Sequence, residues 1–239
     1  STVCAVVAHL ICILLSYLLI HDKEQAKRAV LRYGIIFSNC GYMALPLQNA
    51  LLGTEGIFLG TAYIAVFNLL TWTFGLVLMS GKTSEISIKK VLINPGIIGI
   101  IIGLIIFLTP FKLPVIISSP VQHLANLNTP LPMMVIGFYL AEITTFSVLK
   151  DWKLILGIIV RLIICPLAVL GFMLLCGIRD NILPAMVIAA SAPSAANTTM
   201  FAAKYEKDTG TAVTMVAMGT LFSIITMPLV VSLAISLMK

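Results

Sequence analysis

The sequence predicts an all-α integral membrane protein, on three observations. Hydrophobic residues make up 60% of the 239 residues and charged residues only 10%, whereas a soluble domain has about 25% charged residues. Several uncharged runs approach the ~20 residues that a helix needs to cross a bilayer. Long apolar blocks such as residues 96–108 lack the alternation of polar and apolar residues that a transmembrane barrel shows.

Eight membrane-spanning segments are expected, with short polar gaps between them. They are residues 2–20, 30–52, 56–79, 96–108, 121–147, 154–176, 182–203 and 211–237. A charged stretch ends the first segment, and a tight turn at residues 53–56 separates the second from the third. Pro95 favours a helix start for the fourth, since proline is tolerated in the first turn. Pro110 and Pro114 predict the turn that follows.

The distribution of basic residues predicts the orientation, because Lys and Arg accumulate in short cytoplasmic loops. Eleven lie after segments one, three, five and seven: Lys23, Lys27, Arg28, Arg32, Lys82, Lys89, Lys90, Lys150, Lys153, Lys204 and Lys207. Only Lys112, Arg179 and Lys239 lie on the other side. We therefore expect a multi-pass protein of the cell membrane with both chain ends on the non-cytoplasmic side. The net charge of +6 belongs to these loops and does not indicate a nucleic-acid partner.

The cysteines and the first residue give two further expectations. The five cysteines stand singly within or at the ends of apolar runs, so no metal or cofactor is expected. The chain begins with Ser1, and its first apolar run lacks the flanking features of a signal peptide. We therefore expect residue 1 to lie inside a longer polypeptide.

Two segments carry matching interruptions. These are Asn39, Pro46, Gln48 and Asn49 in segment two, and Ser191, Pro193, Ser194 and Asn197 in segment seven. By the predicted orientation the two segments cross the membrane in opposite directions, so the units around them would be inverted repeats. Paired interrupted helices in inverted repeats indicate the binding site of a secondary transporter. Three segments precede residue 80 and five follow, so a five-helix first repeat would lack two helices.

Several motifs resemble a known family. Residues 37–47 (FSNCGYMALPL) and 67–75 (FNLLTWTFG) resemble the auxin efflux carrier family and its bacterial permease members. Residues 94–95, 130–132, 136–137 and 192–198 are similar to the pattern of the same family. The loop between the halves is short, which favours a bacterial-type member related to malate or malonate permeases.

The resemblance implies a ten-helix fold of two inverted repeats, of which this chain would hold eight helices. Two proline-broken helices would cross at mid-membrane, and a transport unit would move against a scaffold in alternating access. Residues 1–79 and 148–239 would each give three helices of the transport unit, and residues 80–147 a short cytoplasmic loop and two scaffold helices. The implied substrate is a small organic anion, either auxin-like or a dicarboxylate.

The broken helices also predict an anion site on physical grounds. A helix that restarts at Pro46 or Pro193 presents free N–H groups and about half a positive charge, which attracts a carboxylate. The predicted substrate-binding residues are Asn39, Pro46, Asn49, Ser191, Pro193, Ser194, Asn197 and Thr198. For a single helix, a proline kink and hydrogen bonds between helices would be the better explanation. Two matched breaks favour a site.

Glu142 and Arg161 are the only acid and base deep in a predicted span, and such residues are functional hypotheses because burying a charge in lipid is costly. They lie at similar depth, so they could form an ion pair. Arg161 could instead contact the anion, and Glu142 could couple proton movement. His9 and His123 are interpreted as packing or interfacial residues, and Asn68 as a hydrogen bond between helices.

Three classes of function stay open on the sequence. The first is a secondary transporter, an efflux carrier or permease, for a small organic anion. The second is an intramembrane enzyme, which is disfavoured because the broken segments contain no acid or histidine. The third is a passive channel. The expected partners are the organic anion and the lipid bilayer, with a homodimer as an open alternative.

Overall fold

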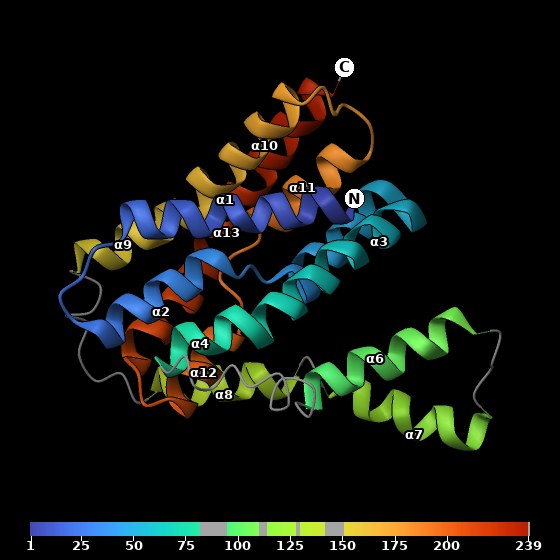
Figure 1. The fold of residues 1–239 in the computed structure, drawn as a ribbon, viewed down its shortest axis with the longest axis horizontal. Coiled ribbons are helices and arrows are strands. Elements are labelled where there is room, and N and C mark those ends of the chain that lie inside the picture. The colour runs from blue at the N-terminus through green and yellow to red at the C-terminus, as the bar shows by residue number, and fades with distance from the viewer. Residues whose placement is uncertain (82–94, 110–113, 128–129, 142–150, 239) are drawn as a thin grey trace.

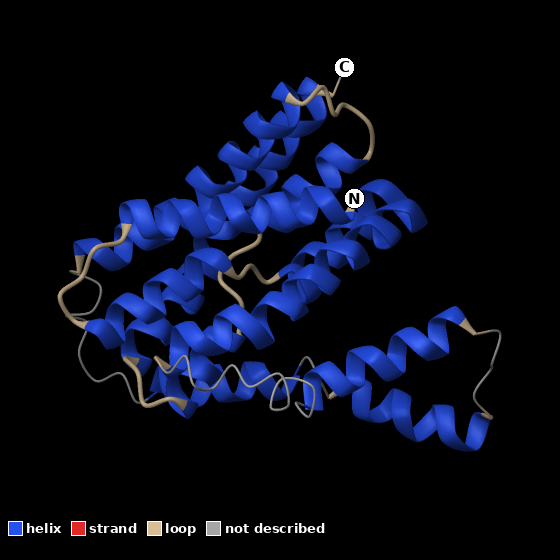
Figure 2. Ribbon diagram, viewed as in Figure 1, coloured by secondary structure: helices blue, strands red, loops and turns tan. Residues whose placement is uncertain are grey.

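The computed structural model describes residues 1–81, 95–109, 114–127, 130–141 and 151–238. These residues form helices joined by loops and contain no β-strand (Figure 2). One isolated antiparallel bridge, between Ser38 and Ser194, is the only β-type pairing among them. The all-α class predicted from the sequence is confirmed for this part of the chain.

The first third of the chain contains four helices, two of which begin with a π-helical turn. They are α1 (Thr2–Leu19), α2 (Gln25–Ile36), the π turn Cys40–Ala44 with α3 (Leu45–Leu70), and the π turn Thr71–Gly75 with α4 (Leu76–Ser80). Within α3, Gly53 has φ 63° and ψ −147°, a conformation that is essentially restricted to glycine. Gly53 therefore divides α3 into two helices, as the predicted turn requires. Gly60 of the second helix lies against the Gln48 side chain of the first.

The middle of the chain forms α6 (Pro95–Leu108), α7 (Val115–Asn126) and α8 (Pro130–Ala141). In Figure 1, α6 and α7 extend away from the other helices as a pair. α8 packs against α12 and α13, whereas α6 contacts α3. The predicted helix start at Pro95 is confirmed. The predicted fifth segment, residues 121–147, falls on the end of α7 and on α8, and its residues 128–129 and 142–147 lie outside the described residues.

The last third surrounds a buried half-helix. Its elements are α9 (Trp152–Ile159), the π turn Val160–Ile164, α10 (Cys165–Leu175), α11 (Ile182–Ser191), α12 (Asn197–Lys204) and α13 (Thr209–Leu237). α11 packs against α3, α10 and α13, and every residue from Leu183 to Ser191 is buried. The core of the bundle is therefore built around a helix of only 10 residues.

Among the described residues, four helices are long and apolar enough to cross a membrane: Thr2–Leu19, Cys40–Ser80, Trp152–Leu175 and Thr209–Leu237. The second contains the turn at Gly53, so it corresponds to two predicted segments. α2 and α11, with 12 and 10 residues, are each too short to span a bilayer alone. The count of eight spans stays a prediction.

Four charged side chains tie the α1–α2 loop to the start of α9. Lys153 Nζ lies 3.0 Å from Asp22 Oδ2, and Lys27 pairs with Asp151. Burial alone would raise the pKa of Asp22. Hydrogen bonds from the Glu24 N–H and from Lys153, with the charges of Lys153 and Lys27, outweigh it and hold this pKa below its ordinary value. The ionised Asp22 therefore contributes to stability.

We expect Gly53→Ala to lower the free energy of unfolding by about 1–3 kcal/mol. A Cβ at Gly53 would meet no atom within 4 Å, so the cost is purely that of the backbone conformation. Gly171, inside α10 and equally uncrowded, is the matched control: Gly171→Ala should be neutral or slightly stabilising. Denaturant unfolding in detergent micelles measures both, and equal effects would contradict the assigned role of Gly53.

We expect Asp22→Asn to lower the midpoint temperature of unfolding at pH 7. The pKa of Asp22 is depressed in the folded state, so its contribution is complete above the unfolded pKa of about 4 and is lost as the pH falls through the lower, folded pKa. The midpoint of the variant should therefore decline less steeply than that of the wild type below about pH 4. Glu24→Gln, at an exposed neighbouring carboxylate, is the control and should decline with pH as steeply as the wild type. If the midpoint temperature declined equally steeply in all three proteins, the stabilising role of Asp22 would be refuted.

Candidate functional site

Two helix breaks meet inside the bundle. α2 ends at Ile36 and α11 at Ser191, and extended backbone follows each. The Asn39 N–H donates to the Pro193 carbonyl at 2.7 Å, and the Ala195 N–H donates to the Phe37 carbonyl at 2.9 Å. The Ser194 hydroxyl adds a 2.8 Å bond to the Gly34 carbonyl. The two breaks are therefore held together by two backbone hydrogen bonds and one from a side chain.

The first break does not lie where the sequence predicted it. The chain leaves α2 at Phe37 and re-enters a helix at Cys40, whereas Pro46 lies in the first turn of α3 and interrupts nothing. A proline inside a helix removes one hydrogen bond and crowds the preceding turn. Here the wider π turn Cys40–Ala44 comes directly before it. The prediction that the helix restarts at Pro46 is wrong, while the restart after Pro193 is confirmed.

The Arg161 side chain is buried next to both breaks. It is 1% exposed, and its guanidinium donates to carbonyls from both half-helices. Nη1 lies 2.6 Å from the Ile35 oxygen, Nε lies 3.1 Å from the Ala192 oxygen, and Nη2 bonds to the Ala190 oxygen. The last carbonyls of a helix lack intrahelical donors and form the negative end of its dipole. Arg161 therefore caps the C-terminal ends of α2 and α11 together.

A cavity of about 350 Å³ lies at the two breaks, and Arg161 is not among the residues that line it. It is bounded by the break at Ser38 and Asn39, the start of the helix at Cys40–Tyr42, the start of α12 at Ala195–Asn197, and α3. The first N–H groups of a helix have no intrahelical acceptors and form the positive end of its dipole. Two helix starts therefore direct donors and partial positive charge toward one cavity.

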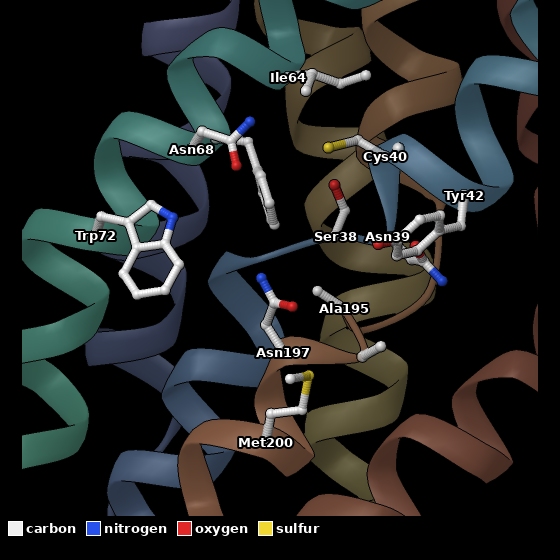
Figure 3. A pocket seen from close by; sticks show the side chains of 13 residues that line it. Ser38, Asn39, Cys40, Tyr42, Ile64, Asn68, Trp72, Ala195, Asn197 and Met200 are labelled. Atoms are coloured by element: carbon white, nitrogen blue, oxygen red, sulfur yellow. The ribbon is translucent and has the colours of Figure 1, made fainter. Parts of the chain in front are cut away.

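Three amide side chains line this cavity, from three parts of the chain. Asn39 follows the first break, Asn197 begins α12 and Asn68 belongs to α3. None of the three forms a side-chain hydrogen bond within the described residues. Asn68 and Trp72 lie on one wall, and Asn197 points into the space beside Ser38 (Figure 3). The buried Ser38 hydroxyl also has no partner among these residues. The cavity thus offers several free neutral donors.

Aromatic rings form the apolar part of the wall. Trp72 packs edge-on against Phe201 at 5.4 Å between ring centroids, and Phe67 packs against Phe37 at 5.8 Å. Phe37 belongs to the first break and Phe201 to α12. The rings therefore join the second half of α3 to both broken segments.

Comparison with known proteins identifies the family of this chain. The family model of the membrane transport proteins, the family of the auxin efflux carriers, matches residues 2–90 and 82–231. The chain belongs to this family. An uncharacterized transporter of Methanothermobacter thermautotrophicus is similar to this chain, with 26% identity over 194 residues. The match covers 80% of this chain, which spans 63% of the length of that relative. The resemblance seen in the sequence is therefore confirmed.

The predicted site residues separate into two groups. Asn39 and Asn197 line the cavity. The other six do not line it. The hydroxyls of Ser191 and Ser194 donate to the carbonyls of Ile188 and Gly34, and the Pro193 carbonyl accepts the backbone hydrogen bond from Asn39. Thr198 is buried, whereas Pro46 and Asn49 are exposed. Gln48, next to Asn49, instead bonds to the Ala185 carbonyl of α11 at 2.7 Å.

Three other residues had been interpreted from the sequence: Asn68, His9 and Glu142. Asn68 lines the cavity and makes no hydrogen bond between helices within the described part of the chain, so that interpretation stays a prediction. His9 packs as predicted: it is buried, bonds to the Ala5 carbonyl and stacks on Tyr63. Glu142 lies outside the described residues, so its pairing with Arg161 stays a prediction.

We expect Arg161→Met to lower the free energy of unfolding by at least about 3 kcal/mol, because three buried carbonyls lose their donor. Arg161→Lys should recover part of the loss, since one ammonium cannot reproduce the planar guanidinium fork. Arg179, an exposed arginine after α10, is the control: Arg179→Met should stay within about 0.5 kcal/mol of the wild type. Denaturant titration in micelles measures all three, and a Met variant at position 161 as stable as the control would contradict the capping role.

Proposed function

We propose that this protein is a secondary transporter that moves a small organic anion across the cytoplasmic membrane by alternating access. One observation carries the proposal: the starts of two half-helices line the same cavity. Each start supplies free N–H groups and about half a positive charge. In membrane transporters such paired starts hold the carboxylate of a substrate. Membership of a membrane transport family supports the same assignment.

The described lining of the cavity carries no full charge, which favours the reversible binding that transport requires over tight binding. Within the described residues, its lining contains no Asp, Glu, Lys, Arg or His. The attraction for an anion therefore comes from helix ends and neutral amides, and no full counter-charge holds the substrate. We propose that Asn39 and Asn197 donate to the substrate carboxylate and that Asn68 and Trp72 contact its body. The conformation of the second break would be maintained by Ser191, Pro193, Ser194 and Thr198.

The connection of the two breaks suggests which parts move together. The backbone bridge and Arg161 link α2, α11 and the π turn before α10 into one body. We propose that α1–α4 and α9–α13 form the transport unit, and that α6–α8 belong to a scaffold against which this unit shifts. The inverted repeat and the predicted cytoplasmic side of the loops are part of the same proposal.

The proposal predicts that Asn197→Ala and Asn39→Ala each raise the KM for transport about 10–100-fold, the cost of losing a hydrogen bond to a charged group. The measurement is uptake and counterflow of labelled indole-acetate, malate and malonate in proteoliposomes, with the protein of the full reading frame. Counterflow is expected from a carrier, whereas a passive channel shows none.

Asn126→Ala is the matched control, because Asn126 is an exposed amide on α7 whose side chain, within the described residues, bonds only to Gln122. It should transport like the wild type. Unchanged transport in the Asn197 and Asn39 variants would refute the assigned site. Uptake without counterflow would refute the carrier mechanism.

A further inference from the structure

A second cavity lies at the end of the bundle where α1 ends and α2 begins. Its volume is about 220 Å³. It is lined by Tyr17, Gln25, Arg28, Ala29, Arg32, Val77, Leu78 and Gly81. These residues belong to the last turn of α1, the first two turns of α2, and the end of α4 with the glycine that follows it. No residue lines both this cavity and the cavity at the helix breaks.

Two arginines, Arg28 and Arg32, line this second cavity. They are four residues apart on α2, so they lie on one helix face about 5–6 Å apart at Cβ, where like charges repel. The Asp22 carboxylate of the loop before α2 pairs with Lys153 and Lys27 instead. Among the described residues, neither arginine forms an ion pair. An anion in the cavity would remove this repulsion.

Both guanidinium groups are already held in position. Arg28 Nη1 donates to the Asp22 carbonyl at 2.7 Å, and Arg32 Nη2 donates to the Ile20 carbonyl at 3.0 Å. The Arg32 guanidinium also lies 4.0 Å from the centre of the Tyr17 ring. A guanidinium has five N–H donors, and each of these two hydrogen bonds uses one of them. The buried Arg32 Nε has no partner in the described part of the chain. The arginines are thus anchored by some donors and leave others for a ligand.

We propose that this cavity binds a phosphate group. Two fixed guanidinium forks match the oxygens of a phosphate, which accepts paired hydrogen bonds from arginine. The Gln25 amide adds a neutral donor, and Val77 and Leu78 form an apolar floor for the group esterified to the phosphate. The ligand is either the headgroup of an anionic phospholipid, which basic pockets between membrane helices bind, or a soluble phosphate. The site does not depend on which anion the protein transports.

The test compares thermal unfolding of the full-length protein in two kinds of nanodisc, phosphatidylcholine alone and phosphatidylcholine mixed with phosphatidylglycerol. A third arm adds inorganic phosphate to the phosphatidylcholine discs. We expect phosphatidylglycerol or inorganic phosphate to raise the midpoint of the wild type by about 2–4 °C. The double variant R28Q/R32Q should lose this shift. A response to the lipid alone identifies a headgroup, and a response to inorganic phosphate identifies a soluble ligand.

The control is the double variant K204Q/K207Q, which removes the same charge from the last residue of α12 and the loop that follows, and leaves the cavity intact. It should keep the full shift. The proposal is overturned if neither addition raises the wild-type midpoint, or if both double variants lose the shift equally, since the effect would then be general attraction to positive charge. If R28Q/R32Q does not fold, the single variants replace it, and an undiminished shift in both overturns the proposal.

Discussion

The ends of two half-helices inside an apolar bundle must be satisfied without water, and Arg161 meets this constraint. Unpaired carbonyls at membrane depth cost several kcal/mol each. Arg161 bonds to carbonyls of both α2 and α11, so one buried cation neutralises the negative ends of two helix dipoles. The positive dipole ends of the helices that restart after the breaks line the cavity. Arg161 thus lies at the negative pole of the crossing, and the helix starts at its positive pole line a cavity whose described lining residues are uncharged.

The sequence predicted the helical class and the second break, because each depends on local composition. The first break was misplaced because the effect of a proline depends on the turn before it. Pro46 follows the π turn Cys40–Ala44, and Pro166 follows the π turn Val160–Ile164. The real break, Phe37–Asn39, is held by the Pro193 carbonyl and by Arg161. Such partners, far away in the sequence, leave no local pattern.

The candidate site was predicted in part for a related reason. Asn39 and Asn197 stand beside the breaks and line the cavity. Asn49 does not, because the rotation of its helix is set by the neighbouring Gln48, which bonds to α11. A step of one residue turns a side chain about 100° around the axis. The sequence did not predict that Asn68 lines the cavity. Asn68 and Trp72 lie one turn apart on one face of an apolar helix, and this shared face was the available signal.

The bridge between the breaks has a consequence for how such proteins diverge. Its two ladder bonds, between Asn39 and Pro193 and between Ala195 and Phe37, use only backbone atoms. Any residue except proline can donate such a bond, so substitutions around the crossing can change which compounds are recognised while the framework persists. Selectivity can therefore evolve side chain by side chain on a constant architecture. Relatives that share this crossing need not share a substrate.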